Sequence, residues 1–151
     1  MRRHDREQSR EFALQAVDEC GYAALGTVNA DGTPYCVPLT IVREGENIYF
    51  HCALAGQKLD NLRRQPRVSL CCVSRARAVQ ETLSIDYASA VVEGLAEEVT
   101  DPEEKAHALR ILCARYAPEN GEGAENCIRR DTQKTGIVRI RILSITGKAN
   151  R

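Results

Sequence analysis

The alternation of hydrophobic and polar positions predicts a sheet of about six strands accompanied by three helices. Residues 136–148 show the pattern most clearly, because the apolar residues Val138 and Ile140 are each followed by an arginine, Arg139 and Arg141. A period of two is typical of a strand with one buried and one exposed face. Several such runs along the chain are separated by short polar turns, which favours antiparallel pairing.

Two stretches carry helical patterns. In residues 5–20 the apolar side chains recur at steps of three and four, which predicts an amphipathic helix. A second helix is predicted to begin at Asp101, with Pro102 in its first position and Glu104 completing a capping box. The polar, glycine-containing segment 117–126 is predicted to be a loop.

Glycine, proline and aspartate residues indicate where the strands turn, bulge or lie at a sheet edge. Asp31-Gly32 lies between two apolar runs in residues 22–42 and predicts a hairpin, because glycine tolerates a positive φ. Pro34 and Pro38 lie in the second of these runs, which is therefore expected at a sheet edge or bulge, since proline has no N–H for a ladder. Residues 82–99 read as one long strand with a bulge at Gly94. The expected fold is mainly β (α+β), an antiparallel sheet or small barrel with flanking helices.

Composition limits the function. The 151 residues suit a single domain, 1–151, and the formal net charge of zero argues against a nucleic-acid binder. No apolar run reaches the roughly 20 residues of a membrane span, and no signal peptide is recognisable, so we expect a cytoplasmic location.

The seven cysteines form no CxxC pair and no cluster of metal ligands, so neither a disulfide framework nor a metal site is predicted. Cys36, Cys52 and Cys71 lie in strand-like runs, where a free thiol usually serves as a small buried apolar group.

The stretch YFHCALAGQKLDNLRRQPRVSL, residues 49–70, is the strongest candidate for a binding site. A helix starting near Gly56 would direct free N–H groups and the positive end of its dipole toward the preceding loop. Lys58 in its first turn opposes that dipole, and a bound phosphate would resolve the conflict. The alternative is that Lys58 is a solvated surface lysine. His51 is likewise either functional or a strand-end histidine bonded to a carbonyl group.

The order of these segments resembles the split barrels related to pyridoxamine 5′-phosphate oxidase, most closely the nitroimidazole-resistance (Nim) branch. The resemblance covers nearly the whole chain, from MRRHDRE through YAALGTVNADGTPYCVPLTIV, IYFHCALAGQKLDNLRRQPRVSL, DYASAVVEGLAEEV and PEEKAHAL to ITGKA.

The resemblance implies a six-stranded antiparallel split β-barrel, a homodimer with FMN at the subunit interface, and a small-molecule substrate. It implies that the second strand lines the flavin. It implies that the end of the third strand and the next loop hold the ribityl chain and phosphate. It also implies that His51 lies beside the ring as the catalytic residue. The flavin-binding positions implied are Tyr35, Val37, Pro38, Leu39, Thr40, Phe50, His51, Gly56, Gln57, Lys58 and Ser89. We further expect the flavin ring to lie against a flat apolar wall formed by Val37, Pro38 and Leu39.

True pyridoxamine phosphate oxidases have a basic residue where Gln57 stands and a C-terminal extension, so vitamin B6 oxidation is not expected. The leading hypothesis is an FMN-dependent oxidoreductase of the Nim-like type, with nitroimidazoles or other nitroaromatics as possible substrates. A second is a non-enzymatic flavin- or haem-binding module with His51 or Cys52 as iron ligand. A third is a dimeric interaction protein without a cofactor.

Overall fold

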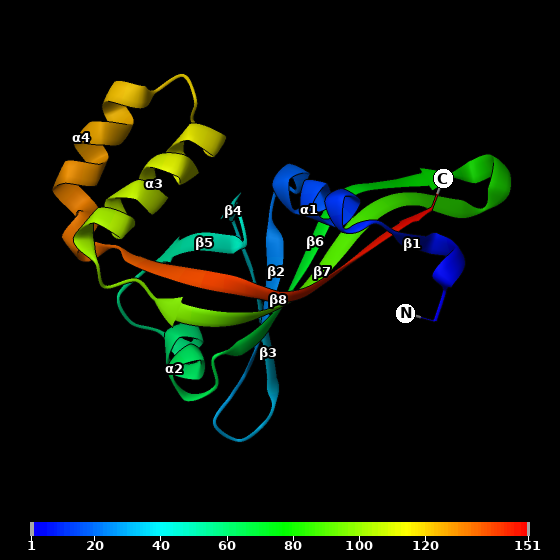
Figure 1. The fold of residues 1–151 in the computed structure, drawn as a ribbon, viewed down its shortest axis with the longest axis horizontal. Coiled ribbons are helices and arrows are strands. Elements are labelled where there is room, and N and C mark those ends of the chain that lie inside the picture. The colour runs from blue at the N-terminus through cyan, green and yellow to red at the C-terminus, as the bar shows by residue number, and fades with distance from the viewer. Residues whose placement is uncertain (1, 151) are drawn as a thin grey trace.

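The computed structural model describes residues 2–150 and consists of one open antiparallel sheet with helices packed on it (Figure 1). Within these residues there are eight strands and four α-helices, and the sheet order is β3-β2-β6-β7-β8-β5-β4, with β1 paired to β8. The strands are β1 (Glu7–Gln8), β2 (Ala23–Val28), β3 (Pro34–Leu39), β4 (Val42–Glu44), β5 (Asn47–Cys52), β6 (Arg67–Val79), β7 (Ser84–Glu98) and β8 (Gly136–Asn150). The helices are α1 (Arg10–Glu19), α2 (Gln57–Arg64), α3 (Pro102–Tyr116) and α4 (Gly121–Asp131).

The predicted antiparallel α+β architecture is confirmed, although the number of elements differs. The short strands β1 and β4 were not predicted, because two or three residues are too few to show an alternating pattern. The first helix is shorter than the predicted 5–20, because the Ser9 hydroxyl caps it by accepting a hydrogen bond from the Phe12 N–H at 3.2 Å.

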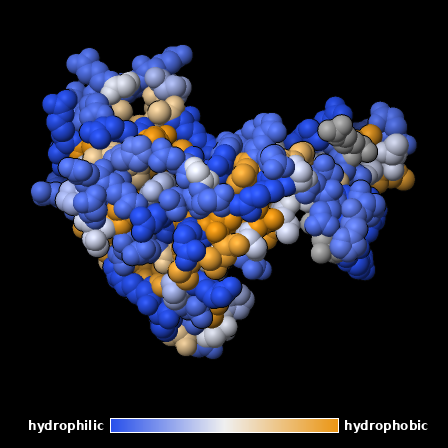
Figure 2. Space-filling model, viewed as in Figure 1, coloured by the Kyte–Doolittle hydropathy of each residue, from blue (hydrophilic) through white to orange (hydrophobic). Residues whose placement is uncertain are grey.

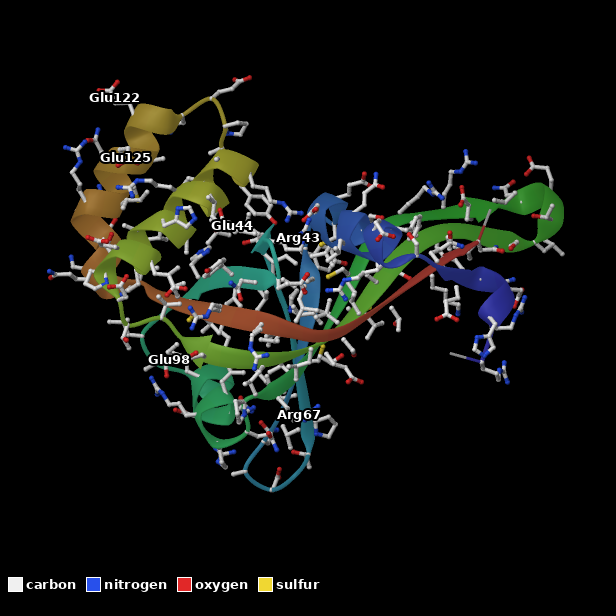
Figure 3. All side chains as sticks on the ribbon, in the orientation of Figure 1. Arg43, Glu44, Arg67, Glu98, Glu122 and Glu125 are labelled. Atoms are coloured by element: carbon white, nitrogen blue, oxygen red, sulfur yellow. The ribbon has the colours of Figure 1, made fainter. Side chains whose placement is uncertain are left out.

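The prediction of a loop over 117–126 is wrong, because α4 begins at Gly121. Tertiary contacts stabilise this helix despite its glycines: Ile128 is buried, and Arg110 of α3 forms an ion pair with Glu125 at 2.7 Å. Figure 3 labels Glu125 on α4, on the side of the molecule where α3 and α4 pack together.

Hydrophobic side chains from most strands fill the space inside the curved sheet, with α1 across β6, β7 and β8 (Figure 1). Ala13 of α1 approaches Gly147 so closely that a Cβ at Gly147 would lie 3.1 Å from the Ala13 Cβ. A second buried cluster lies under α3 and comprises Val42, Tyr49, Val99, Ala108, Leu112 and Ile137.

The start of α3 matches half of the predicted capping box. The Asp101 carboxylate accepts a hydrogen bond from the Glu104 N–H at 2.8 Å. The Glu104 carboxylate does not return the bond, because it pairs with Arg139 of β8 at 2.7 Å and with the Tyr49 hydroxyl at 3.1 Å.

The turn and bulge predictions are confirmed. The β2–β3 hairpin turns at Gly32, where φ is +84°, and β3 pairs only with β2 among the described strands. Pro34 and Pro38 therefore lie on an edge strand. The β7–β8 register shifts beside Gly94, where an added Cβ would collide with the Ile140 side chain.

Of the three strand cysteines predicted to be buried, Cys52 is buried and Cys36 and Cys71 are exposed. Both exposed thiols lie at positions that alternate with core residues, because the strands present them to the outer face of the sheet. None of the helices in residues 2–150 is long and apolar enough to cross a membrane.

Candidate functional site

The start of α2 has the geometry predicted for an anion-binding turn. Gly56 occupies the N-cap with φ +140°, a conformation that favours glycine, and no side chain caps the helix there among the described residues. The first hydrogen bond of the helix runs from the Asp60 N–H to the Gly56 carbonyl at 3.1 Å. The N–H groups of the first turn consequently remain free to bind an acceptor outside the helix.

Lys58 supplies the positive charge at this turn. Its side chain is half-buried, and its Nζ lies 5.7 Å from the centroid of the Phe50 ring at the end of β5. No carboxylate forms an ion pair with Lys58 in the part of the chain that the structure describes. Arg63 of α2 is engaged, because it forms an ion pair with Glu98 of β7 at 2.6 Å (Figure 3 labels Glu98 beside α2). Arg64, at the other end of α2, is exposed. Within residues 2–150, Lys58 is therefore the cation in the first turn of α2 that has no ion-pair partner.

An amide network centred on the buried Asn61 joins this turn to the β2–β3 hairpin. Asn61, only 2% exposed, donates to the Thr27 hydroxyl at 3.0 Å and to the Asn29 side-chain oxygen at 2.9 Å. Gln57 donates to the same Asn29 oxygen at 2.9 Å. The network couples the first turn of α2 to the hairpin that leads into β3, whose Tyr35 carbonyl accepts a bond from Thr27 at 3.4 Å.

Thr27, Asn29 and Asn61 are not among the site residues predicted from the sequence. The available signal was Asn61 itself, a polar residue directly before the apolar Leu62 in a helix whose apolar face it shares. A buried asparagine requires partners for its amide group, and here the partners come from the hairpin. A hollow of about 480 Å³ lies between Asn29, Asp31, Gln57 and Arg64 beside this network.

Strand β3 does not present the predicted flat wall. Val37 and Leu39 are half-buried and pack against the core, whereas Pro38 between them is exposed on the opposite face. Successive side chains of a strand point to opposite faces, so these three residues cannot share one surface. Tyr35 lies on the same face as Val37, and Thr40, half-buried, follows the strand. As an edge strand, β3 also leaves backbone groups unpaired on the side away from β2.

His51 is exposed near the end of β5, opposite Ile137 of β8. Its ring has no hydrogen-bond partner within residues 2–150, so the alternative of a histidine bonded to a carbonyl group does not describe it. Cys52 points the other way and is buried, and burial raises the pKa of its thiol. A protonated, buried thiol is a poor iron ligand, which leaves His51 as the better candidate of the two.

The fold separates Ser89 from the other predicted residues. Phe50, Gly56, Gln57 and Lys58 come together around the α2 turn, whereas Ser89 lies on β7, opposite Val73 of β6. Two strands, β2 and β6, stand between β7 and β3 in the sheet. The Ser89 hydroxyl bonds within the sheet, donating to the Lys148 carbonyl at 3.4 Å.

The fold is an open antiparallel sheet with helices packed on it, and its α2 turn joins a half-buried lysine to a glycine-capped helix start. The sequence model of the pyridoxamine 5′-phosphate oxidase family matches residues 9–149. The chain therefore belongs to this family. Among curated proteins, none matches the sequence.

Solved structures share the fold at low sequence identity. A protein assigned to 5-nitroimidazole antibiotic resistance from Bacteroides thetaiotaomicron is 23% identical, with 93% of this chain and 84% of that chain covered and a TM-score of 0.77. The flavocytochrome Anf3 from Azotobacter vinelandii is 21% identical over 100% of this chain and 72% of its own, with a TM-score of 0.85. A FAD-binding protein from Mesorhizobium loti is 22% identical over 97% and 98%, with a TM-score of 0.69.

Proposed function

We propose that the protein is an FMN-binding flavoprotein and an FMN-dependent oxidoreductase of the Nim-like type that reduces nitroaromatic compounds. The observation that carries this proposal is the α2 turn, where a free lysine and uncapped backbone N–H groups meet beside Phe50. A phosphate monoester with close to two negative charges suits this set of donors. The likeness to a FAD-binding protein and to a nitroimidazole-resistance protein supports the same proposal.

Different residues of the chain would bind the phosphate, line the ring and act on the substrate. Gly56, Gln57 and Lys58 would hold the phosphate, and the backbone of edge strand β3 would line the ring. When bound, FMN supplies the electron transfer. His51, exposed at the end of β5, would donate a proton to the substrate during its reduction.

We propose that the active form is a homodimer with FMN at the interface. Ser89 lies two strands away from β3 in the sheet, and a homodimer would allow one flavin to contact β3 and the α2 turn of one copy and Ser89 of the other. Figure 2 shows hydrophobic residues gathered on the surface where β7 and β8 cross the middle of the molecule. Among the exposed apolar residues of these strands, Val91 is 44% exposed and Leu143 40%. An apolar patch of this kind is typical of a subunit interface.

A haem-binding role is the second candidate, with His51 as the axial ligand. It is favoured by the exposed His51 imidazole, which has no hydrogen-bond partner within residues 2–150, and by the likeness to a flavocytochrome. This module would act as a carrier or sensor and would need no substrate.

The absorption spectrum of the freshly purified protein tests these proposals. Flavin bands in the near ultraviolet and blue, followed by anaerobic turnover of a nitroaromatic acceptor, support the reductase. A Soret band without flavin supports the haem module. The absence of any chromophore, with no uptake of added FMN, would refute both and favour a dimeric interaction protein.

A further inference from the structure

Two cations, Arg6 of the N-terminal turn and Lys148 near the end of β8, lie beside the Tyr87 phenol of β7. Strands β2 and β6 separate β7 from β3 in the sheet. Nη1 of Arg6 lies 3.4 Å from the Tyr87 hydroxyl, and Nζ of Lys148 lies 5.6 Å from the centroid of the Tyr87 ring. All three side chains, here called the Tyr87 cluster, are half-buried. The sheet fixes their positions, because β1 and β7 both pair with the end of β8.

The carboxylates next in sequence to Arg6 and Tyr87 are bound to other groups, and Asp86 pairs with Arg75 at 3.1 Å. Asp5 accepts two hydrogen bonds from Arg3, at 2.7 and 2.5 Å. Glu7, which stands opposite Lys148 in the sheet, bonds to Nδ1 of His4 at 3.0 Å. In the part of the chain that the structure describes, no carboxylate forms an ion pair with either cation of the cluster.

The two cations favour the ionised form of the Tyr87 phenol. The hydrogen bond from Arg6, together with Lys148, holds the pKa of Tyr87 below its usual value, although partial desolvation acts in the opposite direction. A lowered phenol pKa means that this position favours negative charge.

A cavity of about 530 Å³ opens beside the Tyr87 cluster and gives an anion room to approach. It is lined by Arg3, Asp5, Arg6, Gln8, Ala149 and Asn150, so Arg6 is the member of the Tyr87 cluster that reaches it. The Asp5 carboxylate in this lining is already paired with Arg3. The site therefore places the Arg6 guanidinium at a polar hollow, with the Lys148 ammonium and the Tyr87 hydroxyl beside that guanidinium. A guanidinium binds two oxygens of a carboxylate or phosphate, and an ammonium acts on the same group as a point charge.

We propose that the Tyr87 cluster binds the oxyanion group of a small molecule, a phosphate or a carboxylate. This site is separate from the α2 turn, which lies on the segment between β5 and β6. It does not depend on the proposed flavin function. Lys148 is the sheet partner of Ser89, so an anion bound here would lie beside a residue that the family resemblance assigns to the flavin.

The test follows the Tyr87 signal by NMR of protein labelled at the tyrosine Cζ, with Tyr87→Phe for assignment. Flavin-free and FMN-saturated full-length protein are each titrated with inorganic phosphate and, separately, with acetate at constant ionic strength. We expect a saturable shift and a rise of the Tyr87 pKa toward its usual value, because the anion neutralises the cations. Saturation by phosphate alone, or also by acetate, identifies which oxyanion the site accepts.

Variants locate the binding. Arg6→Gln and Lys148→Gln should each weaken phosphate binding about tenfold, whereas Lys134→Gln, which removes an exposed lysine elsewhere, should leave it unchanged. The absence of a saturable shift with both anions, or equal affinity in all three variants, would overturn the proposal.

Competition separates this site from the flavin site. Phosphate binding that disappears in Lys58→Ala, or when FMN saturates the protein, would assign the response to the cofactor and would also refute a separate site. A protein that binds no FMN but retains the Tyr87 response would refute the proposed flavin function and leave the oxyanion site standing.

Discussion

Replacing Lys58 by alanine should weaken FMN binding strongly while leaving the fold intact. A hydrogen bond to a charged group contributes about 1.5–3 kcal/mol, so the Kd for FMN should rise roughly 10- to 150-fold. Lys58 has no carboxylate partner within residues 2–150, so its removal leaves no opposing charge unpaired in the flavin-free protein. The contact with Phe50 stabilises by about 0.5–1 kcal/mol, and the unfavourable position of a cation at a helix start costs a similar amount. The two effects nearly cancel, so the flavin-free protein should unfold at almost the same denaturant concentration.

The measurement is a titration of flavin-free protein with FMN, followed by the quenching of flavin fluorescence, at low and at high salt. Lys58→Arg should retain most of the affinity because it keeps the charge. Lys134→Ala should bind like the unaltered protein because that lysine is exposed on another part of the chain. An unchanged Kd in Lys58→Ala, with Lys134→Ala as the reference, would refute the assignment of the α2 turn as the phosphate site.

Further predictions concern catalysis, assembly and stability. His51→Ala should retain FMN but slow nitroaromatic reduction by on the order of 100-fold, and equal turnover would make His51 a lining residue only. Val91→Glu should yield monomers in sedimentation analysis and lose FMN; a monomer that holds FMN would contradict the interface model. Asn61→Ala should lower the free energy of unfolding by about 1–3 kcal/mol in a denaturant titration, because the buried Thr27 hydroxyl and the half-buried Asn29 amide lose its donor. Tyr116→Phe should cost about 1 kcal/mol in the same assay, because the hydroxyl bonds both the N–H and the carbonyl of Ile41.

The longer strands and the turns were predictable because each depends on neighbouring residues. The alternation in 136–148, the Asp31-Gly32 turn and the bulge at Gly94 all correspond to local backbone geometry. Helix α4 was missed for the opposite reason. Gly121 and Gly123 lower its intrinsic helix propensity, and its stability comes from α3, which contacts it through side chains distant in sequence.

In the candidate site, too, the features set by neighbouring residues were predictable and those set by distant residues were not. Gly56 is the N-cap of α2 and Lys58 lies in its first turn, so the α2 turn could be inferred from the segment itself. The Asn29–Asn61 bond joins residues 32 positions apart, and no local pattern reveals such a pair. Cys36 and Cys71 were misjudged because apolar runs on an open sheet do not show which face is covered.

The order of the strands also restricts how one cofactor could use the proposed residues. The α2 turn is fastened to the β2–β3 hairpin at one edge of the sheet, whereas Ser89 lies inside the sheet on β7. Because β2 and β6 separate β7 from β3, the proposed model has one flavin contact both positions across an interface between two copies. Loss of the interface should then abolish FMN binding even with Lys58 in place. Loss of Lys58 should instead weaken FMN binding in a protein that is still a dimer, so oligomeric state and flavin affinity measured on both variants separate the two contributions.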